Sequence, residues 1–406
     1  MKSGFKDHPD LWAQSLDGGP ICSVHPTAGS AYVAHSIPHA GSLRSGRQPL
    51  ALGTMTFGTA RWGSGDSASR EVFDAYLDAG GNFVDTADVY SGGRSEEMLG
   101  QFISARAARD SIVIATKSGF ATGPGVHMGG NGAKHVRAAL EGSLKRLRTD
   151  YVDLLWVHVW DSVTPAHELL ETMSNLIKAG KVRHWGLSNT PAWYVAQVAT
   201  LAAASGKPAP IALQYFYSLV NRDIEEEFVP LAAEFGMAIQ PWSPLAFGLL
   251  TGKYDRTTVE AAAPRDGGLP REAARADAER PADDKRLDGA NPFGDSLFTD
   301  RNWAILEAVK RVAAECGESA ARVALAWVVQ RPGVTSTLMG VSKIEQLQDN
   351  MTALEIRLSD AHVAQLDQAS ATASRLLYSL FTPSGRQHAV FGGSPVRPWS
   401  ASAPTL

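Results

Sequence analysis

The chain has 406 residues, of which 44% are hydrophobic and 20% are charged, so it holds enough apolar material for one large domain or two ordinary ones. Its formal net charge of -4 comes from Lys, Arg, Asp and Glu mixed along the chain, which argues against a basic face for nucleic acid. The two cysteines, Cys22 and Cys316, supply neither a disulfide framework nor a cysteine-based metal site, and they indicate a reducing compartment.

The N-terminal segment contains no apolar run after a basic start, so it does not resemble a signal peptide. No stretch approaches the roughly 20 consecutive apolar residues that cross a bilayer. By default we expect a cytoplasmic protein with neither a membrane nor a nucleic acid as partner. The sequence leaves its oligomeric state open.

Short apolar runs of β type alternate with longer amphipathic segments from about residue 49 onward. This alternation is typical of parallel strands joined by crossover helices. Eight runs are expected to be strands: 50–54, 82–86, 112–116, 153–158, 182–188, 211–214, 237–240 and 336–340. The first three are followed by helical patterns near 67–79, 95–106 and 133–147.

Eight strand and helix units close naturally into an α/β fold of the (β/α)8 TIM barrel type, with its active site at the carboxyl ends of the strands. The alternative is an open doubly wound sheet. That alternative is disfavoured because no G-x-G-x-x-G follows the strand at 50–54, where such a fold places its phosphate-binding turn.

Three regions interrupt the repeat and define the expected domain boundaries. Residues 1–48 are rich in Gly, Ser, Pro and His without a period, which indicates an irregular extension before a barrel domain at 49–372. Residues 255–300 form a long charged loop after the seventh strand. Extra C-terminal helices are expected in addition to the eight units of the barrel. The aromatic tail 373–406 is expected to lie over or near its mouth.

Side chains suited to chemistry fall at the ends of three successive predicted strands. Asp85 closes the second strand and Tyr90 follows in the adjoining loop, while Lys117 and His158 end the third and fourth strands. Each alone has an ordinary explanation: a turn former, a lysine extending to water, or a satisfied buried histidine. Because all four would meet at one end of a barrel, a single shared site explains them more simply than four unrelated roles.

The chain resembles the aldo-keto reductase superfamily over roughly residues 50–370. The resemblance is carried by the segments NFVDTADVYSGGRSEEMLG, IVIATK, LKRLRTDYVDLLWVH, VRHWGLSN and QPWSPLAFGLLTGKY. It is closest to the bacterial branch that is similar to potassium-channel β-subunits and aryl-alcohol dehydrogenase-like reductases. The resemblance implies reversible, NADP(H)-dependent reduction of an aldehyde or ketone, with Asp85, Tyr90, Lys117 and His158 as the catalytic tetrad.

Simple chemistry accounts for such a tetrad. A hydride that reaches a carbonyl carbon leaves negative charge on the oxygen, so the site must donate a proton or hydrogen bonds there. Tyr90 is the expected acid: a phenol with a pKa near ~10 keeps its proton at neutral pH, and the Lys117 ammonium would stabilise the phenolate. Asp85 would keep Lys117 charged and oriented. His158 would donate to the carbonyl oxygen, for which a neutral imidazole is sufficient.

The resemblance also implies a cofactor site for NADP(H) after the later strands, and no metal site. Ser188, Asn189 and Gln214 match positions that hydrogen-bond the nicotinamide carboxamide, and Trp242 matches an aromatic residue that lies against the nicotinamide ring. Without the resemblance, polar caps and a core tryptophan explain the same residues. The phosphate and adenosine side is assigned to Ser243, Leu245, Gly248, Lys253, Ser342, Gln346, Asp349 and Asn350.

Two features depart from the family pattern. Many relatives have Arg where this chain has Gln346, so Lys343 or Arg286 is expected to supply charge for the 2'-phosphate and the strength of the preference for NADP over NAD is left open. Relatives usually begin with a β-hairpin that plugs the barrel bottom. Residues 1–48 match that hairpin poorly, which suggests that the barrel floor is covered differently.

The loops after the strands predict an apolar or ring-containing carbonyl substrate, because they supply aromatic side chains. The residues expected to line the substrate pocket are Arg61, Trp62, Phe120 to Met128, Trp160 and Tyr217. The sequence does not identify the compound or the physiological direction of the reaction.

Two other functions compete with a reductase. A nucleotide-binding, redox-sensing regulatory subunit of a membrane channel would keep the tetrad but show little turnover, and would expose an apolar patch larger than roughly a few hundred Å². A barrel hydrolase would need paired carboxylates or metal ligands at the strand ends. Asp85 and Asp153 are the only evident pair, and Asp153 lies at the wrong end of its strand.

Overall fold

The computed structural model describes residues 50–59, 63–257, 287, 294–373 and 375–395. The predictions made for residues 1–48, for Arg61, Trp62 and Arg286, and for most of the loop 255–300 lie outside these residues.

Eight parallel strands form one sheet in the order β7-β6-β5-β4-β3-β2-β1-β8. They are β1 (Leu50–Gly53), β2 (Phe83–Asp85), β3 (Val113–Ser118), β4 (Val152–Val157), β5 (Val182–Ser188), β6 (Ala212–Phe216), β7 (Ala238–Trp242) and β8 (Thr337–Gly340). A parallel bridge between Ile239 and Val334 joins β7 to the segment before β8 and closes the ring. The predicted (β/α)8 barrel is therefore confirmed.

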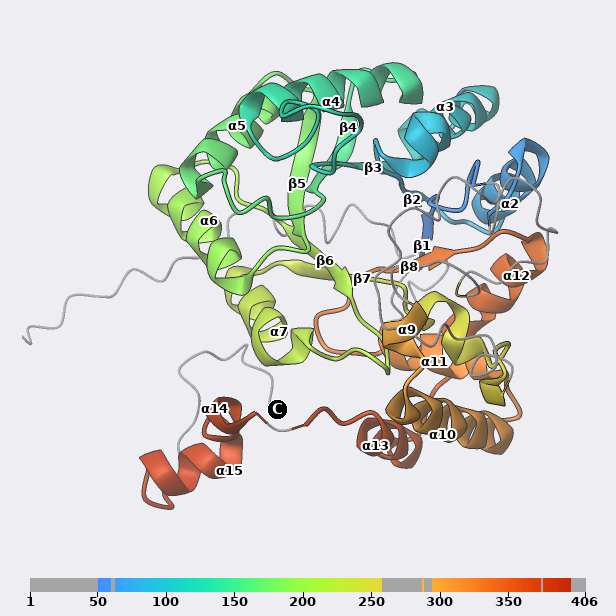
Figure 1. The fold of residues 1–406 in the computed structure, drawn as a ribbon, viewed down its shortest axis with the longest axis vertical. Coiled ribbons are helices and arrows are strands. Elements are labelled where there is room, and N and C mark those ends of the chain that lie inside the picture. Colours follow the sequence, from blue (N-terminus) through green and yellow to red (C-terminus); the bar gives the residue numbers. More distant parts are fainter. Residues whose placement is uncertain (1–49, 60–62, 258–286, 288–293, 374, 396–406) are drawn as a thin grey trace, which may run out of the picture.

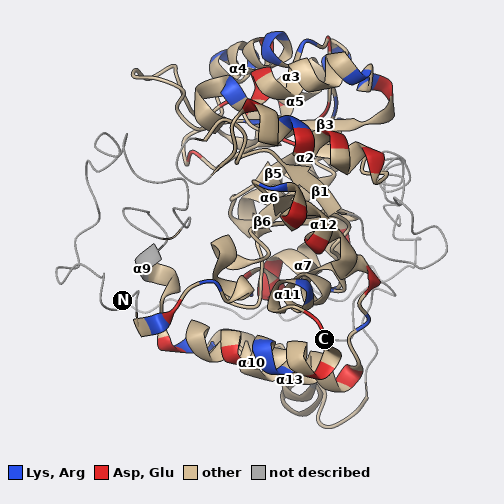
Figure 2. Ribbon diagram, turned by 90° about the vertical axis from the view of Figure 1, so that its right-hand side faces the viewer, with Lys and Arg blue, Asp and Glu red and all other residues tan. Residues whose placement is uncertain are grey.

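Helices follow the strands and surround the barrel as an outer ring (Figure 1). After β1 to β6 these are α2 (Asp66–Asp78), α3 (Arg94–Arg106), α4 (Ala133–Leu147), α5 (Ala166–Lys178), α6 (Ala192–Ser205) and α7 (Ile224–Phe235). After β7 come α9 (Gly294–Leu297), α10 (Asp300–Cys316) and α11 (Ala320–Val329), and after β8 come α12 (Ile344–Thr352) and α13 (Asp360–Ala369). Charged residues of both signs are interspersed along the outer helices (Figure 2).

Several strands are longer than their apolar runs predicted, and the extra residues are polar or bulky. Lys117 lies inside β3, paired with Trp156 of β4, and Trp242 lies inside β7, paired with Phe216 of β6. The neighbouring strands supply hydrogen-bonding partners for these residues, so the ladder continues past the end of the hydrophobic pattern. Lys117 and Trp242 are thereby held on rigid strands rather than on loops.

The inside of the barrel is filled by a cluster of apolar side chains, of which the fully buried Trp156 is the largest buried member. Gly186 of β5 lies directly beside that ring. A Cβ atom added at Gly186 would lie 2.4 Å from the Trp156 ring and 2.7 Å from the carbonyl oxygen of Ala212. The tryptophan therefore fits only because its neighbour on β5 has no side chain. This packing supports the strand ends above it.

The C-terminal tail forms three short turns outside the helical ring: α14 (Leu376–Ser379), α15 (Pro383–Gly385) and η6 (Arg386–Val390) (Figure 1). Tyr378 donates a hydrogen bond to Glu227 and Arg375 pairs with Glu226, both in the first turn of α7. The described part of the tail is therefore anchored beside α7. Within the described residues, no helix is both long enough and apolar enough to span a membrane.

Candidate active site

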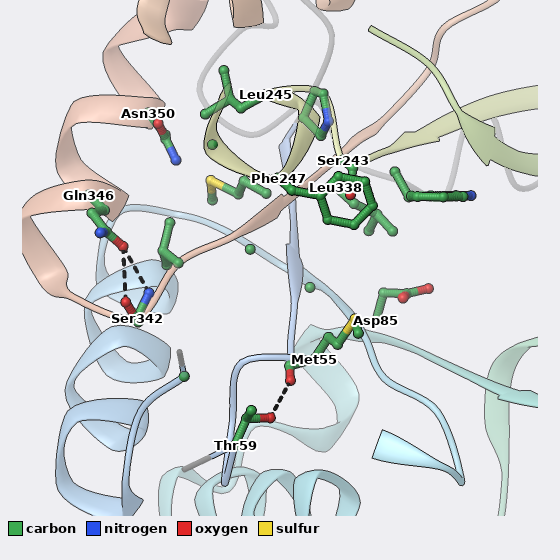
Figure 3. A pocket seen from close by; sticks show the side chains of 18 of the residues that line it. Met55, Thr59, Asp85, Ser243, Leu245, Phe247, Leu338, Ser342, Gln346 and Asn350 are labelled. Carbon is green, nitrogen blue, oxygen red and sulfur yellow. Dashed lines mark hydrogen bonds between the residues drawn. The ribbon is translucent and has the colours of Figure 1, made fainter. Parts of the chain in front are cut away.

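An open pocket of about 1360 Å³ lies at the carboxyl ends of the strands. Its lining includes Asp85, Tyr90 and His158, together with all the residues predicted to bind the cofactor, from Ser188 to Asn350. Figure 3 shows Asp85 and Met55 on one side of this pocket and Gln346 and Asn350 on the other, with Leu245 and Phe247 between them. Side chains that are far apart in the sequence therefore meet around one cavity.

Lys117 lies behind the pocket wall, and its side chain is fully buried. Its ammonium donates hydrogen bonds to the carboxylate of Asp85, to the carbonyl oxygen of Thr86 at 2.8 Å and to the hydroxyl oxygen of Tyr90 at 3.2 Å. Three donors therefore meet three oxygens, which satisfies a buried ammonium completely.

The charge of Lys117 is maintained by these partners. Burial alone lowers the pKa of the ammonium, but the adjacent Asp85 carboxylate and Tyr90 hydroxyl together outweigh that effect. The pKa of Lys117 is consequently raised above its usual value. A positive charge therefore lies next to the phenol of Tyr90 at neutral pH.

The second oxygen of Asp85 is held from across the barrel. Gln214 of β6 donates to it at 3.0 Å and also donates to Gln240 of β7 at 2.8 Å. Gln240 in turn donates to the hydroxyl of Ser336 at 3.3 Å. This chain of side-chain amides spans the barrel interior and fixes the Asp85 carboxylate in one orientation.

Tyr90 begins a tight turn, η1 (Tyr90–Gly93), that closely follows β2. Ser91 adopts a positive φ of 50°, and its hydroxyl donates to the carbonyl oxygen of Phe57 at 3.1 Å. Gly93 has a φ of 93°, and a Cβ there would lie 2.9 Å from the Arg146 side chain. The turn reverses the chain within a few residues and places the phenol back over the strand that carries Asp85.

His158 follows β4 and stands edge-on to Tyr90, with 5.9 Å between the ring centroids. Burial, reinforced by the charge of Lys117, holds the pKa of His158 well below its usual value, so the imidazole is neutral. Its Nδ1 is buried without a hydrogen-bond partner among the described residues. Phe120 packs against this ring with 4.5 Å between the centroids. The site therefore combines a neutral imidazole with a phenol and a buried ammonium.

The opposite half of the pocket begins at Trp242, whose ring stacks on Phe216 at 4.9 Å and whose indole N–H is buried without a partner in the described chain. The chain then enters the irregular turn η3 (Ala246–Thr251), where Phe247 has a φ of 55°. At Gly248 (φ 94°) an added Cβ would lie 2.6 Å from the Lys253 side chain. Lys253 therefore lies across the turn, with its charge at the pocket wall.

Helix α12 forms the far end of the pocket. The segment that leads into it folds back on itself, because the side-chain oxygen of Gln346 accepts hydrogen bonds from the N–H and hydroxyl of Ser342 (Figure 3). Asp349 also lines the pocket, but its carboxylate is already paired with Arg322 of α11 at 2.7 Å. Lys343 and Lys253 add two positive charges to this end of the lining.

The sequence model of the aldo/keto reductase family matches residues 49–371 of this chain. The chain belongs to the aldo/keto reductase family. Norsolorinic acid reductase stcV of Emericella nidulans is 32% identical over 330 residues, which are 79% of this chain and 77% of that protein. As a member of the family, the chain is an oxidoreductase that acts on small carbonyl compounds.

Two further relatives differ in what their names describe. The aryl-alcohol dehydrogenase (NADP+) of Phanerodontia chrysosporium is 31% identical over 352 residues, covering 82% of this chain and 85% of that protein. A probable voltage-gated potassium channel subunit beta of Oryza sativa subsp. japonica is 33% identical over 290 residues, covering 71% of this chain and 82% of that protein.

Of the described residues expected to line the substrate pocket of the reductase, Phe120 does so, whereas residues 121–128, Trp160 and Tyr217 do not. The structure shows why the expectation for Tyr217 is wrong. Its side chain is buried, and its hydroxyl donates to Glu225 at 2.5 Å. It follows β6 by one residue, so its side chain falls on the opposite face of the chain from Phe216. The reductase pocket also has a wall that the sequence interpretation missed, formed by Ser319, Ala321 and Leu325 at the start of α11. The sequence signal that could have located this wall is Ser319, a serine at the N-cap position of the helix.

Asp88 of the reductase was also missed, because it lies between Asp85 and Tyr90 in sequence and resembles an ordinary loop aspartate. It is buried, and neither carboxyl oxygen has a hydrogen-bond partner among the described residues. The fully buried Glu96 lies nearby and is itself held by Thr116 at 2.5 Å and by Arg146 at 2.7 Å. Burial and the Glu96 charge raise the pKa of Asp88 to about 7, against the weaker opposing effects of Arg146, the nearby backbone N–H of Val89 and Lys117.

The substitution Asp88→Asn should stabilise the reductase in a pH-dependent manner. An acid whose pKa is raised on folding, here from 3.8 to about 7, makes the free energy of unfolding fall as pH rises between those values, because only the unfolded state has lost its proton. An amide at this position cannot titrate, so the substitution removes that loss. The variant should therefore gain about 2–4 kcal/mol over the parent protein between pH 4.5 and pH 7.5, measured by urea unfolding.

Asp110→Asn is the matched control, since Asp110 is exposed. Urea unfolding of this variant over the same pH range is the reference for the loss of a surface carboxyl group. A stability difference between Asp88→Asn and the parent protein that does not change with pH would contradict a protonated, buried Asp88.

Proposed function

We propose that the reductase reversibly converts an apolar or ring-containing aldehyde or ketone to the alcohol, with NADP(H) as hydride carrier and Asp85, Tyr90, Lys117 and His158 as its catalytic residues. The observation that carries this proposal is the contact of 3.2 Å between the buried Lys117 ammonium and the Tyr90 hydroxyl at the pocket wall. The neutral His158 ring beside them supplies the second polar group that a reacting oxygen needs.

The pocket suits an elongated dinucleotide. It runs from Asp85 and Tyr90, past the flat ring of Trp242, to the first turn of α12. The buried Trp242 N–H lacks a protein partner among the described residues, and the η3 turn presents backbone groups at positive φ. Ser188, Asn189 and Gln214 lie at the nicotinamide end. At the other end, two lysines and the N-terminus of a nine-residue helix favour phosphate groups.

Bound NADPH would supply a hydride to the carbonyl carbon. As negative charge develops on the carbonyl oxygen, Tyr90 donates its hydroxyl proton there, and the adjacent Lys117 ammonium stabilises the phenolate that remains. His158 donates a hydrogen bond to the same oxygen and orients the carbonyl. Because its pKa is well below neutrality, His158 acts as a neutral donor over the physiological pH range.

Asp85 acts through Lys117. It does not need to touch the substrate, since its carboxylate holds the ammonium on one side and accepts from Gln214 on the other. Removing its charge would leave a buried ammonium with neutral oxygen partners alone. The ammonium would then lose its proton more readily, because burial alone disfavours the charged form.

Selectivity for NADP over NAD requires a cation near the 2'-phosphate. Lys343, next to Ser342, is the residue we assign to this role among those that line the far end of the pocket. Arg322 is an additional cation of this region, although it is paired with Asp349 and Glu318. Gln346 contributes hydrogen-bonding capacity without charge.

Ring-containing substrates are supported by two observations. The Phe120 ring lines the pocket directly beside His158, so the surroundings of the carbonyl site are aromatic. Relatives named for an aryl alcohol and for norsolorinic acid point the same way. One relative is named as a potassium channel subunit, so a regulatory role is the second candidate function for this chain. A regulatory role predicts cofactor binding with negligible turnover.

The substitution Tyr90→Phe tests the proton donor. Carbonyl reduction should fall by about 10²–10⁴-fold in kcat, because the hydroxyl is lost while the ring and its packing remain. The dissociation constant for NADPH, measured by quenching of protein fluorescence, should change by less than about 2-fold. Tyr378→Phe on the exposed tail is the control and should leave both values unchanged. Undiminished turnover by Tyr90→Phe would rule out Tyr90 as the acid.

The substitution Gln346→Arg tests the location of the 2'-phosphate. A guanidinium at this position should raise the ratio of kcat/KM for NADPH to that for NADH about 10-fold, since only NADPH carries the extra phosphate. Gln368→Arg, on an exposed position of α13, controls for the added charge and should leave the ratio unchanged. An unchanged ratio for Gln346→Arg would place the phosphate elsewhere.

A further inference from the structure

Exposed large apolar side chains fall into two groups in the part of the chain that the structure describes. One group lies on the tail: Leu376, Leu377, Leu380, Phe381, Val390 and Phe391. The other lies on the loops at the barrel mouth: Met55, Phe120, Val126, Met128, Val163 and Trp193. Among the described residues, the outer faces of the barrel helices away from the mouth carry none. Apart from the tail, the exposed apolar area therefore lies at the end of the barrel that holds the active-site pocket, which Met55 and Phe120 line directly. Exposed apolar area of this kind is a marker of binding.

The mouth group is mostly on one side of the pocket. Phe120, Val126 and Met128 are on the loop after β3, Val163 is on the loop after β4, and Trp193 is at the start of α6 after β5. These three strands are neighbours in the barrel, so their loops form one continuous edge. The residues assigned to the phosphates lie after β7 and β8, on the other side.

This edge begins at the reacting groups. The Phe120 ring lies 4.5 Å from the His158 ring, and Trp160 follows His158 two residues later in the same loop. Trp160 packs edge-on against Trp193 at 5.5 Å and lies 6.2 Å from Tyr194. Trp193 also lies 5.6 Å from the Tyr194 ring, so it is supported by both rings yet remains 59% exposed. One face is therefore fixed and another is open to a ligand.

The edge is also almost without charge. The loop segments 119–132, 158–165 and 189–193 contain one Asp, Glu, Lys or Arg, which is Asp161. Its carboxylate is used internally, because it accepts hydrogen bonds from the N–H of Asn131 at 2.8 Å and from the N–H and hydroxyl of Thr164 at 2.9 and 2.6 Å. Asp161 thereby ties the loops after β3 and β4 together, so the apolar edge is held in place.

We propose that Met128, Val163 and Trp193, which lie beyond Phe120 on this edge, form an outer subsite that binds a second ring of the substrate, distal to the carbonyl group that reacts at Tyr90. The subsite fits a neutral, extended aromatic carbonyl compound, since it offers flat apolar surface and its single carboxylate is used within the loops. This inference rests on the proposed function. A ring seated on Trp193 is bound without contact to the reacting atoms, so the subsite determines affinity and selectivity rather than the rate of the chemical step.

The substitution Trp193→Ala tests the subsite with two aldehydes, benzaldehyde and biphenyl-4-carbaldehyde. For the two-ring aldehyde, KM should rise about 10-fold with kcat within about 2-fold, because stacking surface is lost away from the reacting carbon. For benzaldehyde, KM should rise by no more than about 2-fold. The ratio of kcat/KM for the two-ring aldehyde to that for benzaldehyde therefore falls about 5- to 10-fold. Trp193→Phe should restore most of this ratio, because phenylalanine again presents an aromatic face.

Leu377→Ala is the matched control, since Leu377 is a similarly exposed apolar residue on the tail. It should leave the ratio of the two aldehydes unchanged. An unchanged ratio in Trp193→Ala would overturn the proposal. Analytical ultracentrifugation gives a second way to overturn it. If Trp193→Ala changes the oligomeric state but leaves the ratio of the two aldehydes unchanged, the edge is an interface between two copies of the chain.

A second readout separates failure of the subsite from failure of the proposed function. Binding of biphenyl-4-methanol, measured by isothermal titration calorimetry, does not depend on turnover. It should be about 10-fold weaker in Trp193→Ala than in the parent protein. If neither aldehyde is reduced but this difference is found, the subsite stands and the proposed reaction fails. Equal binding by both proteins would overturn the subsite whatever the turnover.

Discussion

The buried ion pair between Lys117 and Asp85 is the constraint on which the rest of the site depends. A fully buried ammonium is strongly disfavoured unless every donor is satisfied and an opposite charge lies next to it. Adjacent strands meet this requirement here, because β2 ends at Asp85 and pairs with β3, which carries Lys117. The third donor is directed at Tyr90. The Tyr90 hydroxyl is therefore one of the hydrogen-bond acceptors that make the burial of the Lys117 charge possible.

This requirement extends across the barrel. Asp85 is oriented by Gln214, Gln214 by Gln240, and Gln240 by Ser336. Residues of β2, β6 and β7 and the residue that precedes β8 therefore form one hydrogen-bonded chain. Beneath it, Trp156 fills the interior and depends on Gly186 for space. The positions of Asp85 and Lys117 are thus set by the closed barrel, whereas Tyr90 and His158 lie in the segments that follow β2 and β4. The loops remain free to determine substrate size, as the apolar edge around Trp193 illustrates.

The sequence predicted the barrel because the alternation of apolar runs and amphipathic helices repeats along the chain, and it predicted the shared site because Asp85, Lys117 and His158 end successive strands. Side-chain contacts were harder to foresee. The burial of Tyr217 depends on how the chain turns after β6. The raised pKa of Asp88 depends on its burial and on the charge of Glu96, which lies in the helix that follows. Pairing of Asp349 with Arg322 joins two helices that no local pattern connects.

The protonation state of Lys117 tests the central claim most directly. Protein labelled with ¹⁵N at lysine Nζ can be titrated by NMR, with Asp85→Asn as the comparison. The account predicts that Lys117 remains a charged ammonium from pH 6 to pH 9 in the parent protein and that it loses its proton at distinctly lower pH in Asp85→Asn, because burial alone lowers its pKa. A neutral amine at pH 7 in the parent protein, or the same titration in both proteins, would contradict it.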